Sequence, residues 1–356
     1  MSLVPRLAFM LLAISVAQLA QADILIGGYG NSTSPQPLAR FSDDAHGDVA
    51  PVSLLGGPST GLLTPVSGTY ESSEGVIYIG DFYGKAVSVF PAYASGDVAP
   101  IRTLSPAILG QPRQPVVDAA HDELILVGSG CCIQTYARDA SGTTGWPLRM
   151  LAWGGGSGSV TQLNNAQSTT YLSATDEVAV VDSDALPPYA SKILVFNRSD
   201  NGNTAPKRVI TGAATGLDSG LSGLAWDAAS RRFFALVQRP LPDFNQTGHI
   251  LVFDDQADGD VAPLREIAGV NTALDSTGGD EYLNGIALDW IHRRLLVSTS
   301  INSNAPRYPR LIVHDIDASG DAMPVHVVSG AQTGLTGALG TPIFVPADEI
   351  MVNGFD

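Results

Sequence analysis

One short pattern recurs along the chain, and a fixed repeat constrains the fold more than any local feature does. The pattern is Ala-x-Gly-Asp-x-Ala-Pro, with some degenerate copies. Its six copies occupy residues 45–51, 94–100, 140–147, 200–206, 257–263 and 318–324. The marker glycines are Gly47, Gly96, Gly142, Gly202, Gly259 and Gly320, at intervals of 49, 46, 60, 57 and 61 residues. This period indicates a ring or array of similar units rather than two unrelated domains.

Between successive markers, each unit contains four short segments that read as β-strands. Examples are a small-residue segment at 223–227, an apolar segment at 295–297, a segment ending in Val-Phe at 250–253, and an alternating segment at 264–267. β-Branched and aromatic residues dominate, and no stretch sustains a 3.6-residue period. Four short antiparallel strands per unit are typical of a propeller blade. The sequence therefore predicts an all-β fold, a six-bladed β-propeller of four-stranded antiparallel blades.

The two ends of the chain supply the strands that one blade lacks. Residues 24–27, 38–41 and 52–55 match the second, third and fourth strands of a unit, while 341–345 and 349–352 match a first and a second strand. Pairing N-terminal with C-terminal strands would close the ring and remove the open sheet edges, which favour aggregation. Seven candidates for second strands leave the register of closure open.

The N-terminal segment has the features of a signal peptide. Arg6 precedes an apolar run at residues 7–16, and Ala20-Gln21-Ala22 provides a small-x-small cleavage site. We therefore expect residues 1–22 to be removed on export to the periplasm or the medium. Residues 23–356 are then expected to form one propeller domain, which we expect to be a monomer without a membrane span.

The charge of the chain restricts its partners. Acidic residues outnumber basic ones by 35 to 19, and the net charge is −16. Nucleic acids and anionic membranes are bound by clustered Lys and Arg, so the sequence argues against both kinds of partner.

The order of a small first strand followed by two apolar strands resembles the NHL-repeat and gluconolactonase (senescence-marker) group of six-bladed propellers. That resemblance implies a divalent metal in the central channel, with an Asn before the Gly of a first strand as one ligand. Asn284-Gly285 matches this motif. The equivalent positions in the other units are Ser67, Arg113, Gln167, Ser222 and Leu339.

A metal-dependent lactonase or related hydrolase is therefore one hypothesis. A divalent cation such as Ca²⁺ needs several oxygen ligands and would activate a water molecule against a carbonyl group. The candidate metal ligands are Asn284, Asp81, Asp182, Asp218 and Glu281. The alternative is that Asn284 simply begins a strand, because the aligned ring of residues contains no carboxylate and includes the cationic Arg113.

Two acidic segments, 254–260 and 315–321, look superficially like calcium loops. They lack the terminal Glu of an EF-hand. Asp followed by Gly is also the ordinary chemistry of a tight turn, and a turn is needed in every blade. We therefore interpret these segments as turns.

Cys131 and Cys132 are the only cysteines. Free thiols rarely persist in an exported protein, so a vicinal disulfide is expected. A stiffened loop, a platform for a ligand, and free or intermolecular thiols remain open. A redox enzyme that uses this pair is a third functional hypothesis.

The leading hypothesis is an exported binding module without catalytic activity. Long connections are expected to share one face of the propeller, and function concentrates in such loops. The candidate ligand-binding residues are Arg113, Gln167, Asn284, Tyr83, Tyr282 and Tyr308. Aromatic and amide side chains suit a carbohydrate, another small molecule or a protein partner. Whether the chain is an enzyme stays open.

Overall fold

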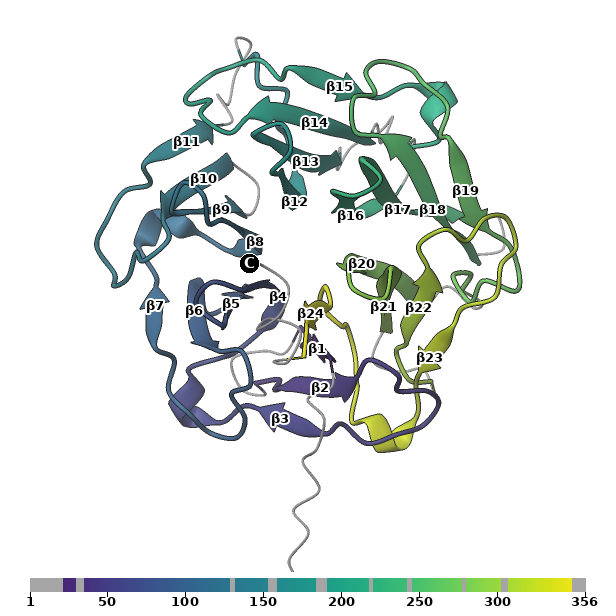
Figure 1. Ribbon diagram of the computed structural model, residues 1–356, viewed down its shortest axis with the longest axis horizontal. Helices are drawn as coiled ribbons and strands as arrows, with labels where there is room; N and C mark the ends of the chain where they lie inside the picture. The colour runs from purple at the N-terminus through teal and green to yellow at the C-terminus, as the bar shows by residue number, and fades with distance from the viewer. Residues whose placement is uncertain are drawn as a thin grey trace, which may run out of the picture.

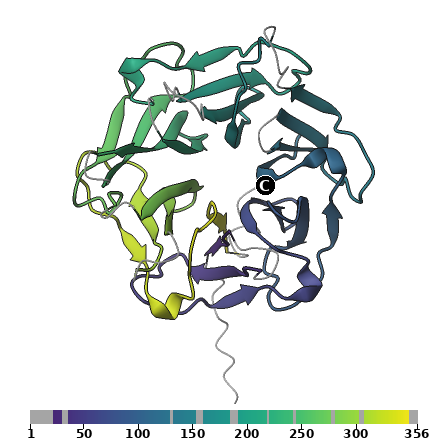
Figure 2. The same cartoon turned by 180° about the vertical axis from the view of Figure 1, so that it is seen from behind.

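The protein is a ring of six β-sheets around a central axis, seen from its two sides in Figures 1 and 2. This computed structural model describes residues 22–29, 35–128, 132–152, 159–183, 191–217, 220–241, 245–276, 280–301 and 307–347. Within these residues, 24 strands form six four-stranded sheets, joined by connections that include four short 3₁₀ helices. The all-β six-bladed propeller predicted from the repeat is confirmed. In this part of the chain, no helix is long and apolar enough to cross a membrane.

Each blade runs from an innermost strand at the central axis to an outermost strand at the rim, as labelled in Figure 1. In that order, blade 1 contains β24 (Ile343–Val345), β1 (Asp23–Ile26), β2 (Leu38–Ser42) and β3 (Ser53–Leu55). Blade 2 contains β4 (Pro65–Glu71), β5 (Val76–Asp81), β6 (Ala86–Pro91) and β7 (Arg102–Leu104). Blade 3 contains β8 (Pro112–Asp118), β9 (Glu123–Gly128), β10 (Cys132–Ala137) and β11 (Arg149–Ala152).

The remaining blades follow the same order. Blade 4 contains β12 (Ala166–Leu172), β13 (Glu177–Ser183), β14 (Ser191–Asn197) and β15 (Arg208–Ile210). Blade 5 contains β16 (Leu221–Asp227), β17 (Arg232–Pro240), β18 (Gln246–Asp254) and β19 (Arg265–Ala268). Blade 6 contains β20 (Glu281–Asp289), β21 (Arg294–Ile301), β22 (Leu311–Asp315) and β23 (His326–Val328). The 3₁₀ helices are η1 (Pro58–Thr60), η2 (Ala107–Leu109), η3 (Ala213–Thr215) and η4 (Ala331–Thr333).

Blade 1 closes the ring with strands from both ends of the described chain. β24 pairs antiparallel with β1, and Ile343 lies opposite Leu25. One C-terminal strand therefore completes a blade that has three N-terminal strands, which settles the register that the sequence left open. The second expected C-terminal strand, at residues 349–352, lies outside the described residues.

The cores between blades explain the apolar runs of the middle strands. In β13, Val178 and Val180 pack on the side of blade 3, whereas Ala179 and Val181 pack on the side of blade 5. Successive side chains of a strand point to opposite faces of its sheet. Because both faces of a blade are covered, the strand is apolar at every one of these positions.

The marker glycines connect each blade to the preceding one. The six parallel bridges join Gly47 to Val328, Gly96 to Leu55, Gly142 to Leu104, Gly202 to Leu151, Gly259 to Ile210 and Gly320 to Ile267. All six glycines have φ between 59° and 85°, a region that favours glycine. The repeat therefore marks contacts between blades, and the contact of Gly47 with Val328 joins blade 1 to blade 6.

The Asp after the marker glycine makes a second contact with the preceding blade. Asp260 Oδ1 accepts a hydrogen bond from the Ala214 N–H in η3 at 2.7 Å. Asp97 Oδ1 accepts one from the Ser59 N–H in η1, also at 2.7 Å. These carboxylates bind main-chain N–H groups that helices leave unpaired at their first turn. The acidic segment around Asp260 is thus a turn that fastens blade 5 to blade 4.

A second repeat, Gly-x-x-Thr-x-Leu, was not predicted. Its copies occupy residues 57–62, 212–217, 269–274 and 330–335. In the first copy, the Thr60 hydroxyl donates to the Gly57 carbonyl at 2.7 Å and accepts from the Leu62 N–H at 3.2 Å. The other copies repeat both bonds. This repeat fixes the conformation of the segment whose main-chain N–H group binds the Asp carboxylate of the next blade.

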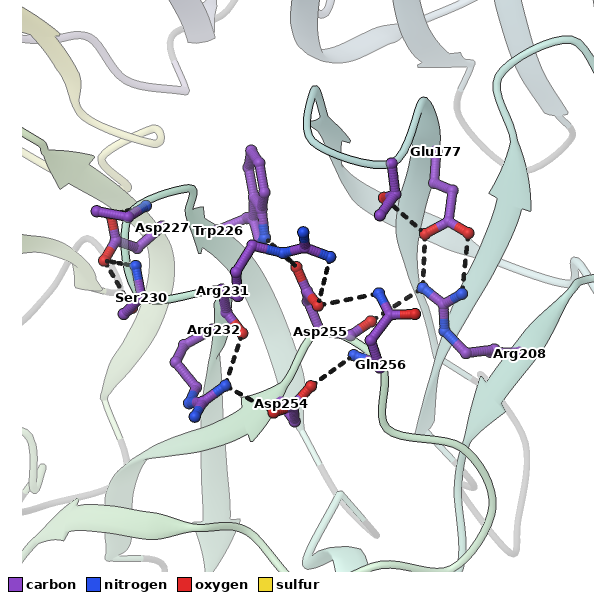
Figure 3. Close-up of polar contacts among 12 residues, drawn as sticks. Glu177, Arg208, Trp226, Asp227, Ser230, Arg231, Arg232, Asp254, Asp255 and Gln256 are labelled. Carbon is purple, nitrogen blue, oxygen red and sulfur yellow. Dashed lines mark hydrogen bonds and ion pairs between the residues drawn. The ribbon is translucent and has the colours of Figure 1, made fainter.

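A buried ion pair adds a further link between blades 4 and 5 (Figure 3). Arg208 donates from both terminal nitrogens to the Glu177 carboxylate, at 2.9 and 2.7 Å, and also to the Asp255 carbonyl at 2.9 Å. Burial alone would raise the pKa of Glu177, but hydrogen bonds from Arg208, Lys207 and Thr175 outweigh it and lower the pKa to about 2. Glu177 is therefore ionised at neutral pH.

Candidate functional site

Bulges in the inner strands position the side chains at one end of the central channel. The pairing of β12, β16 and β20 shifts by one residue at Gln167, Ser222 and Asn284. β4 and β8 also have an irregularity near their starts. A bulge leaves one residue unpaired and turns its side chain away from the regular pleat. In blades 4, 5 and 6 the bulge therefore directs one side chain per blade toward the channel.

These residues line a cavity of about 260 Å³, which we call the channel mouth. Its polar lining includes Ser67, Arg113, Gln114, Gln167, Ser222, Asn284 and Thr341. Five of these are the positions that the sequence aligned with one another. Among the described lining residues, none is Asp or Glu, and Arg113 is the one with a formal charge. The mouth thus combines amide and hydroxyl groups with one positive charge.

Arg113 is held without a carboxylate partner among the described residues. Its guanidinium carbon lies 4.9 Å from the centre of the Phe82 ring, in a cation–π contact. Its Nε atom is buried and makes no hydrogen bond with the described protein. A buried donor without a partner carries a desolvation cost, which a bound acceptor would offset.

A belt of hydrogen bonds lies beside Arg113 and joins four blades. The Gln114 N–H donates to Ser67 Oγ at 2.8 Å, and the Ser168 hydroxyl donates to Gln114 Oε1. The Leu224 N–H donates to Ser168 Oγ at 3.3 Å. Gln114 has a φ of 29°, in the left-handed region, although it is not a glycine. Such backbone conformations persist where the surroundings fix them, often at binding sites.

Tyr29 adds a hydroxyl group to the mouth. Burial raises the pKa of Tyr29, and the nearby charge of Arg113 opposes that rise only in part. The phenol is therefore neutral at physiological pH and remains able to donate a hydrogen bond.

Asp81, one of the predicted metal ligands, is occupied by its own connection. It is buried, and its carboxylate accepts from the N–H groups of Leu63, Thr64 and Gly84 at 2.7, 2.8 and 3.0 Å. The Thr64 hydroxyl also donates to it, at 2.9 Å. Asp81 therefore fixes the chain that enters blade 2, and it is not among the lining residues of the mouth.

Asp182 and Glu281 are also buried and paired away from the mouth lining. Asp182 accepts from the Asn164 N–H at 2.7 Å, and Lys192 Nζ lies 3.8 Å from it. Glu281 forms an ion pair with Arg310, with 2.7 Å between Nε and Oε1. The structure does not gather these carboxylates around Asn284.

Asn284 does line the mouth, and its side-chain amide donates to the Leu339 carbonyl. Leu339, which the sequence aligned with Asn284, does not line the mouth. Leu339 forms a bridge with Gly28, and Thr341, two residues later, lines the mouth in blade 1. Asp218 lies outside the described residues, and metal binding by this set stays a prediction.

The predicted aromatic residues divide into two groups. Tyr282 lines the mouth, whereas Tyr83 and Tyr308 are exposed and are not among its lining residues. Tyr83 packs edge-on against Phe82, with 5.2 Å between ring centres. Phe82, which also lies under Arg113, is thus the aromatic residue that supports the site from blade 2.

Cys132 is buried at the start of β10, and the Gln134 amide contacts its Sγ atom at 3.3 Å. Cys131 lies outside the described residues. The vicinal disulfide therefore stays a prediction.

Several residues of the mouth were not predicted, and two of them left a signal in the sequence. Gly27-Gly28-Tyr29 follows β1 and aligns with Gly80-Asp81-Phe82 at the end of β5, which would have placed Tyr29 beside the channel. Gln114 directly follows the aligned Arg113. Gln238 contacts blade 6 by accepting from the Leu283 N–H at 3.0 Å, and no repeat marks that residue.

Function was expected on the face with the long connections, yet a larger cavity lies at the opposite end of the inner strands. It has a volume of about 600 Å³. Its lining includes the aromatic side chains of Tyr70, Tyr171, Trp226, Trp290 and Phe344. We call it the turn-face cavity, because it is bordered by the short turns that join the first and second strands.

Comparison with known proteins supports the fold. No family model and no curated protein matches the chain. A chain in the crystal structure of a nidogen/laminin complex aligns over 91% of this chain and 98% of its own length, with a TM-score of 0.58 and 12% identity. A chain of Kuenenia stuttgartiensis hydrazine synthase aligns over 79% and 71%, with a TM-score of 0.52 and 10% identity. These similarities support a six-bladed propeller and do not confirm the NHL-repeat or gluconolactonase group.

Proposed function

We propose that the protein is a binding module that takes a small oxyanion, a carboxylate or a phosphate bearing hydroxyl groups, in the channel mouth. The observation that carries this proposal is the Arg113 guanidinium, which has no carboxylate partner among the described residues and faces a ring of amides and hydroxyls. Guanidinium groups bind carboxylates and phosphates through charge-assisted hydrogen bonds. The side chains around it suit hydroxyl groups on the same ligand.

The charge of the mouth favours this ligand over a metal ion. Hard cations need carboxylate or carbonyl oxygens, and a nearby guanidinium repels them. Of the metal ligands suggested by the gluconolactonase resemblance, Asn284 lines the mouth, while Asp81, Asp182 and Glu281 are engaged elsewhere. The anion proposal therefore accounts for more of the described lining than the lactonase alternative does.

The similar folds are compatible with binding but do not decide the activity. One belongs to a complex of two proteins, nidogen and laminin, and the other to a synthase. Since one fold hosts both roles, we base the binding proposal on the channel mouth.

A paired ligand screen tests the role of Arg113. Each acid, such as succinate, gluconate or glycerol phosphate, is compared with a neutral amide or alcohol of similar shape by thermal shift and calorimetry. Acids are expected to raise the melting temperature by mass action, and their neutral analogues are not. Arg113→Gln is expected to weaken acid binding about 10- to 100-fold, because it removes a charged hydrogen-bond donor.

Arg232→Gln is the matched control, because Arg232 pairs with Asp254 away from the mouth. It is expected to bind the acid as the unmodified protein does. Equal binding of acids and neutral analogues, or full binding by Arg113→Gln, would contradict the proposal.

We also propose that residues 1–22 direct export and that the mature chain begins at Asp23. The proposal rests on Arg6, the apolar run at residues 7–16 and the small-x-small site at residues 20–22. Intact-mass analysis of the protein recovered from a bacterial periplasm or from the medium is expected to give a chain that starts at Asp23. A chain that keeps residues 1–22 and remains in the cytoplasm would refute export.

A further inference from the structure

The turn-face cavity and the channel mouth are consecutive sections of one channel. Each inner strand lines the mouth near its start and the turn-face cavity near its end, as Ser67 and Tyr70 do in β4. Gln114 lines both sections, so the belt that it forms with Ser168 lies between them. The lining side chains differ on the two sides of this belt: amides and Arg113 line the channel mouth, and aromatic rings line the turn-face cavity.

The rings of the turn-face cavity are held in place by their neighbours. Trp290 packs edge-on against Phe344, with 4.8 Å between ring centres and an interplanar angle of 87°, yet remains 48% exposed. Trp226 donates from Nε1 to Asp255 at 3.0 Å. The Tyr171 hydroxyl donates to Asp176 Oδ1 at 3.0 Å. An exposed ring with a fixed orientation provides a flat apolar surface at low entropic cost.

Polar groups stand beside these rings on one side of the cavity. Asp118 and His121 form a pair with 2.6 Å between Oδ2 and Nδ1. The side chain of Asp176 is 48% exposed, and its contacts with Tyr171 and Arg198 both use Oδ1. The Oδ2 atom of Asp176 therefore remains available to accept a hydrogen bond from a ligand.

The charges of this polar group are compensated within the protein. Arg198 Nε lies 3.3 Å from Asp118 and 2.6 Å from Asp176. Asp118, His121 and Asp176 could by their spacing hold a metal ion, but the positive charge of Arg198 already lies against both carboxylates. No Lys or Arg is among the described lining residues, so the cavity also has no counter-ion for an anion. These features favour a neutral ligand rich in hydroxyl groups.

We propose that the turn-face cavity binds a short neutral carbohydrate. Sugar rings present an apolar face, which fits the surface of Trp290, and an edge of hydroxyl groups, which fits Asp176 and His121. The volume of about 600 Å³ lies within the range of about 300–1,000 Å³ that is common for small-molecule sites. This site is separate from the oxyanion site at Arg113 and lies at the opposite end of the inner strands.

Tryptophan fluorescence and calorimetry with neutral di- and trisaccharides, such as cellobiose, maltotriose and chitobiose at millimolar concentration, test the proposal on the mature chain. At least one saccharide is expected to bind and to shift the emission. Trp290→Ala is expected to weaken that binding about tenfold or more, because stacking is lost. Trp146→Ala is the matched control, since Trp146 is 78% exposed and is not a lining residue.

Asp176→Asn provides a second variant with a smaller change in shape, and it is expected to weaken saccharide binding while the circular dichroism spectrum stays unchanged. Arg113→Gln is expected to leave saccharide binding intact, so failure of the oxyanion proposal would not affect this test. Absence of binding across the panel would overturn the carbohydrate proposal. Binding that Trp290→Ala and Asp176→Asn leave unchanged would also overturn it.

Discussion

Arg208→Met is expected to lower the free energy of unfolding by about 3–5 kcal/mol, because it leaves the Glu177 carboxylate buried without its main partner. Both side chains are almost fully buried, and the pair has two parallel hydrogen bonds. The variant also loses the contact of Arg208 with the Asp255 carbonyl, which joins blade 4 to blade 5 (Figure 3). Urea denaturation followed by circular dichroism measures the effect.

Two further variants separate the buried charge from general damage. Lys207→Met removes the other cation at Glu177, but Lys207 is 49% exposed, so its loss is expected to cost less than about 1 kcal/mol. Glu177→Leu combined with Arg208→Met removes both charges and is expected to recover much of the lost stability. If Arg208→Met costs no more than Lys207→Met, the pair does not stabilise the contact between these blades.

The same pair determines part of the response to acid. The pKa of Glu177 is lowered to about 2 in the folded protein, against about 4.3 in an unfolded chain. The unfolded state therefore binds this proton first, and the contribution of Glu177 is fully present above the unfolded pKa and is lost as the pH falls toward 2. In Glu177→Gln, the free energy of unfolding is expected to fall less steeply between pH 5 and pH 2.

Gly212→Ala is expected to lower the free energy of unfolding by about 2–4 kcal/mol, the second large effect. Gly212 precedes η3 with φ 127° and ψ 170°, a region that only glycine adopts readily. A Cβ atom there would overlap the Asp260 carboxylate. The substitution would therefore strain the backbone and displace the carboxylate that binds the Ala214 N–H. Thermal and urea unfolding measure the loss.

Gly259→Ala separates the two contributions, because Gly259 has a φ of 77° but no atom within 4 Å of the position that a Cβ would take. Gly259→Ala is expected to lower the free energy of unfolding by about 1–2 kcal/mol, because alanine is strained in the left-handed backbone conformation. Equal losses in the two variants would mean that the contact between Asp260 and the preceding blade contributes nothing.

The repeat predicted the fold well because each unit folds in the same way and adjoins the next. The aligned positions Ser67, Arg113, Gln167, Ser222 and Asn284 line one cavity for the same reason. In blade 1 the alignment chose Leu339, which does not line that cavity, whereas Thr341, two residues later, does. That unit is divided between the chain ends, so pairing with β1, rather than sequence spacing, sets its register.

The chemistry of single residues was harder to predict, because contacts within a connection are not visible in a repeat. Asp81 resembles a metal ligand in sequence, but it accepts main-chain hydrogen bonds from Leu63 and Thr64. The turn-face cavity was missed for a different reason. Tyr171 and Trp290 are far apart in the sequence, and only the closed ring places both around one cavity.

A crystal structure of the mature protein with the acid that stabilises it most is the most direct test of the oxyanion site. We expect the carboxylate or phosphate group to lie within hydrogen-bonding distance of the Arg113 guanidinium, with hydroxyl groups near Gln167 or Asn284. An acid bound elsewhere, with Arg113 making no contact with it, would contradict the proposed function.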